Sequence, residues 1–140
     1  MYDLKRFVKA QESAFSTALY EIKSGEKCSH WMWYIFPQIR GLGLSSMAYK
    51  YGIEDINEAK EYMQNEYLRD NFLTICNALL ELEISDPHKV FGFPDNLKLK
   101  SSMTLFAIAT PEYDVFQKVL DKYFNSQKDE KTIMLLGCSN

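Results

Sequence analysis

The feature that most constrains this chain is the stretch of residues 29–38, which reads SHWMWYIFPQ. It contains both tryptophans of the chain and one of its two histidines, and six successive large apolar residues run from Trp31 to Phe36. Side chains of this size cannot stay together in water without promoting association. The segment must therefore be buried or line a pocket, and polar residues bracket it on both sides.

Length and composition predict one soluble, cytoplasmic domain spanning residues 1–140. With 140 residues, 46% of them hydrophobic, the chain can bury the core of one ordinary domain. Its first residues lack the apolar run of a signal peptide, and no stretch approaches the length that crosses a bilayer, so we expect no membrane partner. The formal net charge of −3 argues against nucleic-acid binding, which needs a surplus of Lys and Arg. The sequence specifies no oligomeric state.

The three cysteines, Cys28, Cys76 and Cys138, lie far apart in the sequence. They form neither a disulfide framework nor a CxxC metal motif, and reduced thiols fit a cytosolic compartment. Cys76 lies among apolar residues, where a free thiol behaves as a small hydrophobe. We expect Cys76 in the core.

Apolar residues recur at the three-and-four spacing of a helix face along most of the chain, and no convincing pair of strands is present. The pattern predicts an all-α domain, a single irregular bundle of about six helices. Residues 97–100 also alternate like a strand, but the longer repeat through Ala107 favours a helix. The predicted helical segments are residues 4–22, 56–63, 68–79, 87–91, 95–109, 115–124 and 130–136.

Several helix ends are predicted from capping residues. The proposed N-terminal caps are Asp3, Asp86 with Pro87, Thr110 with Pro111, and Asp129, and the proposed C-terminal stops are Gly25, Gly92 and Gly137. Gln11 lies on the apolar face of the first helix, where its amide needs hydrogen-bond partners. It therefore either braces a neighbouring loop or reaches into a pocket beside residues 29–38.

Two conformations are open for residues 29–38. In the first, Ser29 caps a short helix that begins at His30 and ends before Pro37, and the tryptophans belong to the core. In the second, the segment is extended, and Trp31 and Trp33 share one face. Residues 41–52 follow as a loop with at most one helical turn, and they lack the third glycine of a dinucleotide-binding motif.

The polar residues around the tryptophans suit an anionic, nucleotide-like ligand. Indole faces stack on planar rings, and an imidazole can give or take a proton near neutral pH. Cationic and hydroxyl groups further along the chain could hold an acidic group, although the lysines fit a solvated helix face equally well. The candidate catalytic residue is His30, and the candidate ligand-binding residues are Gln11, Ser29, Trp31, Trp33, Gln38, Lys98, Lys100 and Ser101.

Familiar enzyme motifs are absent from the sequence. It contains no HExxH, no P-loop and no GxSxG. With His30 and His88 as the only histidines, we expect no histidine-rich metal site, and no cofactor is implied. A Cys28–His30 nucleophilic pair would lack the third, orienting group that an activated cysteine needs.

A distinctive set of residues resembles a known family. It consists of Asp3-Leu4, Arg6-Phe7-Val8, Ala10-Gln11, the whole of residues 29–38, Gly41-Leu42-Gly43, Ala48, Tyr51, Lys98, Ser101 and residues 103–106. In these positions the chain resembles the domain of unknown function 1810 family, small bacterial and fungal proteins sometimes labelled calpastatin-like. The resemblance covers nearly the whole chain and implies an all-α single domain without a settled activity. Calpastatin inhibitory segments are disordered and polar, so a compact, aromatic chain is not expected to inhibit calpain.

Two functional hypotheses follow. The first is a small-molecule-binding domain, or an enzyme in which His30 acts as general acid or base while Lys98 balances the charge of the substrate. The second is a non-enzymatic interaction or scaffold module whose aromatic cluster is purely structural. A polar-lined cavity beside residues 29–38 favours the first, and a solid interior there favours the second.

Overall fold

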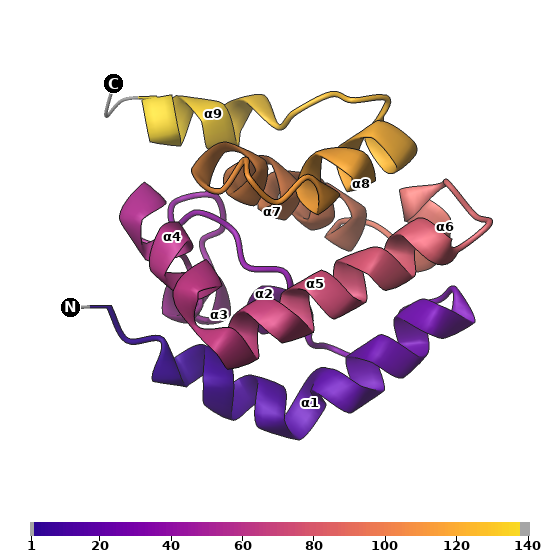
Figure 1. Cartoon of the computed structure of the whole chain (residues 1–140), viewed down its shortest axis with the longest axis horizontal. Coiled ribbons are helices and arrows are strands. Elements are labelled where there is room, and N and C mark those ends of the chain that lie inside the picture. The colour runs from indigo at the N-terminus through magenta and orange to yellow at the C-terminus, as the bar shows by residue number, and fades with distance from the viewer. Residues whose placement is uncertain (1, 138–140) are drawn as a thin grey trace.

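The computed structural model describes residues 2–137, and within this range the chain forms nine α-helices (Figure 1). The predicted all-α class is confirmed, but the predicted number of about six helices is too low. The helices are α1 (Lys5–Ser24), α2 (Met32–Ile35), α3 (Ser46–Lys50), α4 (Ile56–Gln64), α5 (Glu66–Glu81), α6 (Pro87–Phe91), α7 (Asp95–Ala109), α8 (Val115–Phe124) and α9 (Glu130–Gly137). The excess arises chiefly because α2 and α3 have only four and five residues, too few for an apolar repeat to be visible.

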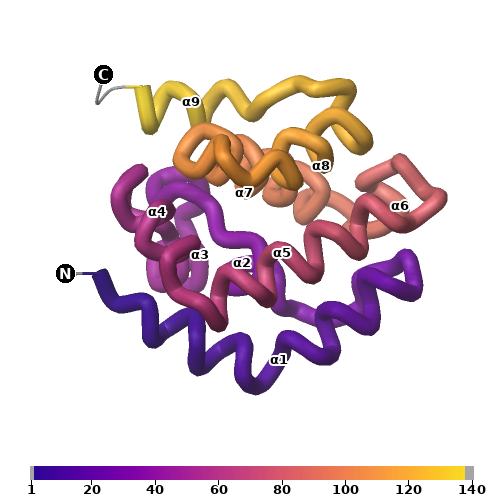
Figure 2. Tube along the Cα trace, in the orientation of Figure 1, coloured from indigo at the N-terminus to yellow at the C-terminus, as the bar shows by residue number. Residues whose placement is uncertain are grey.

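Helix α5 runs through the middle of the molecule, with α1 packed along one side and α8 along the other (Figure 1). Helix α7 packs against α8 and also contacts α4, α6 and α9. The chain between α1 and α4 passes behind α5 in the view of Figure 2. This segment contains residues 29–38, of which Trp31, Met32, Ile35 and Phe36 are buried and His30 is exposed.

The core is built around aromatic rings. Phe72 of α5 contacts Phe106 of α7 and Phe116 of α8, with ring centroids 4.9 and 5.0 Å away. It also contacts Phe36 and Tyr62 in edge-to-face arrangements at 6.0 and 5.7 Å. Aromatic pairs at these separations add to the free energy of burial. Phe36 thus joins residues 29–38 to the centre of the core.

Residues 29–38 contain one helical turn, and they do not adopt the extended conformation. The turn begins at Met32, not at His30, and Trp31 occupies its N-cap position without a side-chain hydrogen bond. Ser29 is therefore not a cap. The turn ends at Ile35, and Phe36 leaves the helical region just before Pro37, as expected for a residue that precedes proline.

The capping predictions succeeded at some helix ends and failed at others. Gly25 ends α1 in the left-handed region with φ 88°, and the Asp86 and Asp129 carboxylates accept backbone N–H bonds at the starts of α6 and α9. Asp3 is not the cap of α1, because Leu4 holds that position. Thr110 ends α7 instead of starting α8: its hydroxyl donates to the Phe106 carbonyl at 2.9 Å. Cys76 is fully buried as predicted, whereas Cys138 lies outside the described residues.

The loop around α3 is closely packed at two glycines. A Cβ atom added to Gly43 would lie 2.7 Å from the Ala48 Cβ, and one added to Gly52 would lie 2.8 Å from the Arg40 Cβ and 2.9 Å from the Ala48 carbonyl oxygen. An isolated parallel bridge between Ile39 and Ile53 ties the two ends of this loop together. The loop therefore has little freedom to move relative to the core.

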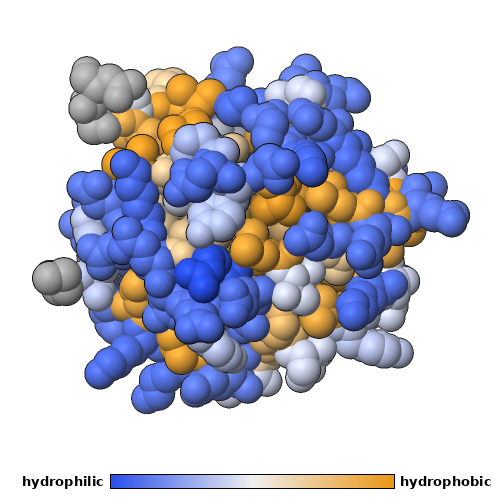
Figure 3. Space-filling view, viewed as in Figure 1, coloured by the Kyte–Doolittle hydropathy of each residue, from blue (hydrophilic) through white to orange (hydrophobic). Residues whose placement is uncertain are grey.

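Within the described residues, none of the helices is both long and apolar enough to span a membrane. The face drawn in Figure 3 is mainly hydrophilic, with hydrophobic residues in a band across its middle and also over α9 near the C-terminal end. There Ile133, Met134 and Leu135 are 39%, 68% and 39% exposed.

Replacing Gly52 with alanine tests the close packing of the loop. The new methyl group has no space beside Arg40 and Ala48, so we expect Gly52→Ala to lower the free energy of unfolding by about 1–3 kcal/mol. Urea denaturation measures this change. Gly137→Ala is the control, because nothing lies within 4 Å of the added Cβ, and it should leave the stability unchanged or raise it. Equal effects of the two substitutions would contradict this description of the loop.

Candidate functional site

A cavity of about 420 Å³ lies between α2, the loop around α3 and the start of α7. It is the hollow nearest to residues 29–38 that has room for a small molecule, since ligand pockets usually measure some 300–1,000 Å³. Most of its wall is apolar. The lining residues are Trp33, Gln38, Leu42, Gly43, Leu44, Ser45, Ala48, Pro94, Leu97, Lys98 and Ser101.

The cavity brings together four of the predicted site residues, Trp33, Gln38, Lys98 and Ser101. The backbone of Gln38 is fixed, because its carbonyl accepts the Ile53 N–H at 2.8 Å. Its side-chain amide has no hydrogen-bond partner within residues 2–137. The Ser101 hydroxyl donates to the Leu97 carbonyl at 3.2 Å and can still accept a hydrogen bond. The wall thus offers an unused amide and a hydroxyl acceptor.

Among residues 2–137, Lys98 is the one ionisable side chain in the wall of this cavity. Its ammonium lies 4.8 Å from the centroid of the Trp33 ring, which is a cation–π contact. It also lies 3.3 Å from one carboxylate oxygen of Asp95, one helical turn earlier in α7. A positive charge therefore sits directly over the aromatic wall.

Asp95 holds a second lysine on its other oxygen. The Lys27 ammonium is 2.8 Å from that oxygen, and the Lys27 side chain is only 6% exposed. Lys27 also lies 4.9 Å from the centroid of Trp31 and donates to the Ser29 carbonyl. The two tryptophans are thus each covered by a lysine, and Asp95 connects the two lysines. The prediction from sequence did not include Asp95 or Lys27 as site residues, although Asp95 and Lys98 show the spacing of a helical ion pair.

Trp31 and Ser29 belong to a separate polar cluster around Glu21 in the interior. The Trp31 indole is 1% exposed, and its N–H donates to a Glu21 oxygen at 2.8 Å. The same oxygen accepts the backbone N–H groups of Cys28 and Ser29 at 2.8 and 3.0 Å, and the Ser29 hydroxyl donates to the other oxygen. Burial alone would raise the pKa of Glu21, but these hydrogen bonds outweigh it and lower the pKa from 4.5 to about 2.

The remaining predicted residues lie outside the cavity. His30 is exposed and does not line it. Gln11 is 2% exposed, and its amide donates to the Tyr34 carbonyl of α2 and the Tyr62 hydroxyl of α4 at 2.8 and 2.9 Å, so it braces these two helices and does not reach into the cavity. Lys100 lines a different surface hollow, formed with residues 127–131 and Ile133. Within residues 2–137, no group of three His, Cys, Asp or Glu side chains is placed to hold a metal ion.

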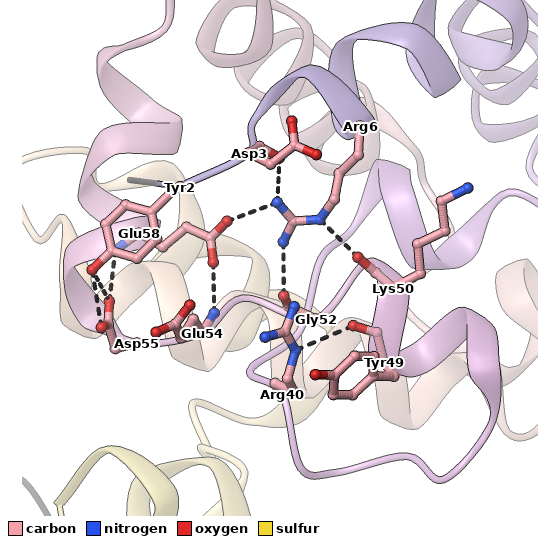
Figure 4. Close-up of polar contacts among 10 residues, drawn as sticks. All are labelled: Tyr2, Asp3, Arg6, Arg40, Tyr49, Lys50, Gly52, Glu54, Asp55 and Glu58. Carbon is pink, nitrogen blue, oxygen red and sulfur yellow. Dashed lines mark hydrogen bonds and ion pairs between the residues drawn. The ribbon is translucent and has the colours of Figure 1, made fainter.

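A second polar cluster anchors the loop that forms one wall of the cavity (Figure 4). The Arg6 guanidinium donates to the Lys50 and Gly52 carbonyls at 2.7 and 2.8 Å. It also forms an ion pair at 2.9 Å with Glu58, whose side chain is 2% exposed. Glu58 in turn accepts the Glu54 N–H at 2.7 Å. Arg6 thus fixes the end of α3, and Ala48 of that helix lines the cavity.

The low pKa of Glu21 means that this carboxylate contributes to stability in acid. A group whose pKa is depressed by folding contributes stability above its unfolded pKa, and that contribution is lost as the pH falls toward the folded value. We expect the free energy of unfolding of the wild type to decrease from pH 4.5 toward pH 2 more steeply than that of Glu21→Gln. Urea titrations at several pH values measure both slopes, and parallel slopes would contradict the assignment.

Arg6→Met tests the buried ion pair in the loop anchor. The substitution leaves the Glu58 carboxylate buried without its counter-charge, so we expect a loss of about 3 kcal/mol in the free energy of unfolding. Lys118→Met is the matched control, because Lys118 pairs with Asp114 at 3.3 Å while both side chains are more than half exposed. It should change stability by less than about 0.5 kcal/mol. A small effect of Arg6→Met would show that the pair does not anchor the loop.

Comparison with known proteins places the chain in a family whose activity is unknown. The structure is similar to the crystal structure of the conserved hypothetical protein Rv1873 from Mycobacterium tuberculosis, with a TM-score of 0.95, 41% sequence identity and 97% of each chain covered. No curated protein matches the chain. The model of a family described as proteins of unknown function (DUF1810) matches residues 1–136. The resemblance noted in the sequence is thereby confirmed, and the chain belongs to the DUF1810 family.

Proposed function

We propose that this protein binds a small molecule that carries a planar ring and an acidic group, in the cavity between α2 and the start of α7. One observation carries the proposal. Trp33 and Gln38 come from one segment and Lys98 and Ser101 from another, yet all four line the same mostly apolar hollow of about 420 Å³. Convergence of a few polar groups on an apolar pocket is the usual character of a ligand site.

Each of these groups has a distinct role in the proposed recognition. The Trp33 ring offers a flat surface for the ring of the ligand. Lys98 balances the negative charge of the acidic group. The Gln38 amide can donate and accept hydrogen bonds, and it spends neither capacity on the described protein groups. The ligand would thus be bound by stacking, charge and hydrogen bonds at once.

The geometry supports binding better than catalysis. General acid–base catalysis requires a titrating group within hydrogen-bond reach of the reacting atoms. Lys98 is the one ionisable side chain that the described part of the chain places in the wall, and His30, the candidate general acid or base, is exposed and lies outside it. We therefore propose a binding role that does not use His30.

A protein-interaction module is the second candidate, and exposed apolar residues near the cavity favour it. Leu44 and Leu97 line the cavity and are 101% and 48% exposed, and Phe93, next to the lining residue Pro94, is 72% exposed. Apolar side chains at the rim of a pocket are typical of a surface that receives a partner. In this alternative, a partner side chain would occupy the place of the small molecule.

Thermal denaturation with defined probes tests the proposed function. The probes are adenosine 5′-monophosphate, benzoate and phenyl phosphate, and a probe that binds only the folded protein raises the Tm. At about one hundred times its Kd, a bound probe should raise the Tm by about 5 °C or more. Lys98→Gln and Trp33→Leu should abolish the rise, whereas Lys100→Gln, which removes a charge two residues away and outside the cavity, should preserve it.

Two results would overturn the proposed function. The first is the absence of any Tm rise across the probes, and this result would favour the interaction module. The second is a rise that persists in Lys98→Gln and Trp33→Leu, because the probes would then bind elsewhere. Both variants must unfold cooperatively without probe for the comparison to hold, as circular dichroism can establish.

A further inference from the structure

We infer that Asp95 determines which ligands the cavity prefers by charge, so that a ligand with one negative charge binds better than a ligand with two. This inference rests on the proposed function and narrows it to monoanions such as aromatic carboxylates. It starts from the position of the Asp95 carboxylate, which is shared between Lys27 and Lys98; of these three side chains, Lys98 lines the cavity.

The three side chains form a group with one surplus positive charge. Lys27 and Lys98 each carry one positive charge, and Asp95 carries one negative charge between them. Their side chains are 6%, 25% and 19% exposed, so water screens these charges only in part. An acidic group that binds at Lys98 therefore meets both the lysine and, just behind it, the Asp95 carboxylate.

The two ion pairs of Asp95 differ in a way that makes Lys98 the mobile partner. The Lys27 pair is shorter, at 2.8 Å, and lies deeper in the protein. The Lys98 pair is longer, at 3.3 Å, and Lys98 also contacts the face of Trp33. A ligand can recruit Lys98 from Asp95 and from the ring, while Lys27 keeps Asp95 in place.

Charge selection follows from this arrangement. A monoanion at Lys98 neutralises the group of three side chains, whereas a dianion leaves one surplus negative charge close to Asp95. The dianion also loses far more hydration on entering the cavity, and a single surplus positive charge does not offset that cost. Like charges that face each other at short range oppose binding. The cavity should thus bind a carboxylate better than a phosphate monoester on the same ring, even though the phosphate carries more charge.

The experiment compares three probes with one benzene ring at pH 7.5: benzyl alcohol, benzoate and phenyl phosphate, which is nearly a dianion at this pH. Isothermal titration calorimetry gives the Kd of each probe for the wild type and for three variants. Asp95→Asn removes the opposing charge, so the affinity for phenyl phosphate relative to benzoate should rise about tenfold. Lys27→Met lowers the charge of the group to zero, so this ratio should fall.

Opposite changes in the two variants distinguish charge selection from damage to the fold, because both variants break the same buried ion pair. If Asp95→Asn fails to fold with Lys27 left unpaired, Lys27→Met still tests the inference, since Asp95 then retains Lys98. Asp114→Asn is the matched control: it removes a carboxylate at the start of α8 that pairs with Lys118 at 3.3 Å. It should leave the ratio unchanged, and the Kd of benzyl alcohol should change little in any variant.

A measurement without ligand tests whether Asp95 holds Lys98 over the Trp33 ring. The indole N–H resonance of Trp33, assigned with Trp33→Phe, should shift in Asp95→Asn because Lys98 loses the partner that holds it over the ring. It should not shift in Asp114→Asn, and an unmoved resonance in Asp95→Asn would overturn the inference. If the wild type binds none of the probes, the proposed function fails and this inference fails with it. If the wild type binds and neither variant changes the ratio, only the inference fails.

Discussion

The indole N–H of Trp31 needs a hydrogen-bond acceptor inside the core, and Glu21 provides it. An unpaired N–H at a fully buried position costs free energy, and so does an unpaired carboxylate. The hydrogen bond between Glu21 and Trp31 avoids both costs, and Glu21 also accepts the backbone N–H groups of Cys28 and Ser29. The chain is thereby held against α1 just before α2 begins. With Trp31 directed inward, Trp33 lies two residues further on, half-buried, where it lines the cavity.

Helix α7 is buried on several sides and shows little amphipathic pattern. Periodicity predicted the other long helices because each has an apolar face that repeats over several turns. It was insufficient for α2 and α3, since a single turn shows no repeat, and capping rules failed at Thr110, whose hydroxyl had a nearer carbonyl acceptor in α7. For the candidate site, residue chemistry selected Trp33, Gln38, Lys98 and Ser101 among its candidates, and these four residues line one cavity. It could not separate them from Ser29 and Trp31, because neighbours in sequence can point to different surroundings, and only tertiary contacts decide which one faces a hollow.

Two ion pairs with little exposure to water connect separate segments of this protein. Arg6 with Glu58 fixes the end of α3, and Lys27 with Asp95 joins the segment after α1 to the start of α7. Removing one partner of such a pair is costly, because the other charge then remains buried alone. Lys98 differs from these residues. Its ammonium lies 3.3 Å from Asp95, compared with 2.8 Å for Lys27, and its side chain is more exposed than that of Lys27. The structure thus leaves a loosely held positive charge at the cavity, whereas the positive charges of Arg6 and Lys27 are held more firmly.

The packing around the cavity decides how a ligand would gain affinity there. One wall is held by Arg6 and by the close approach of Gly43 and Gly52 to Ala48, and the opposite wall is a helix of fifteen residues. Ordering a loop on binding costs free energy, and a wall that is already fixed avoids that cost. What remains free to adjust is the Gln38 amide and the Lys98 ammonium. Selectivity would then depend on the charge and hydrogen-bonding groups of the ligand, because the walls of the cavity are already held in place before the ligand binds.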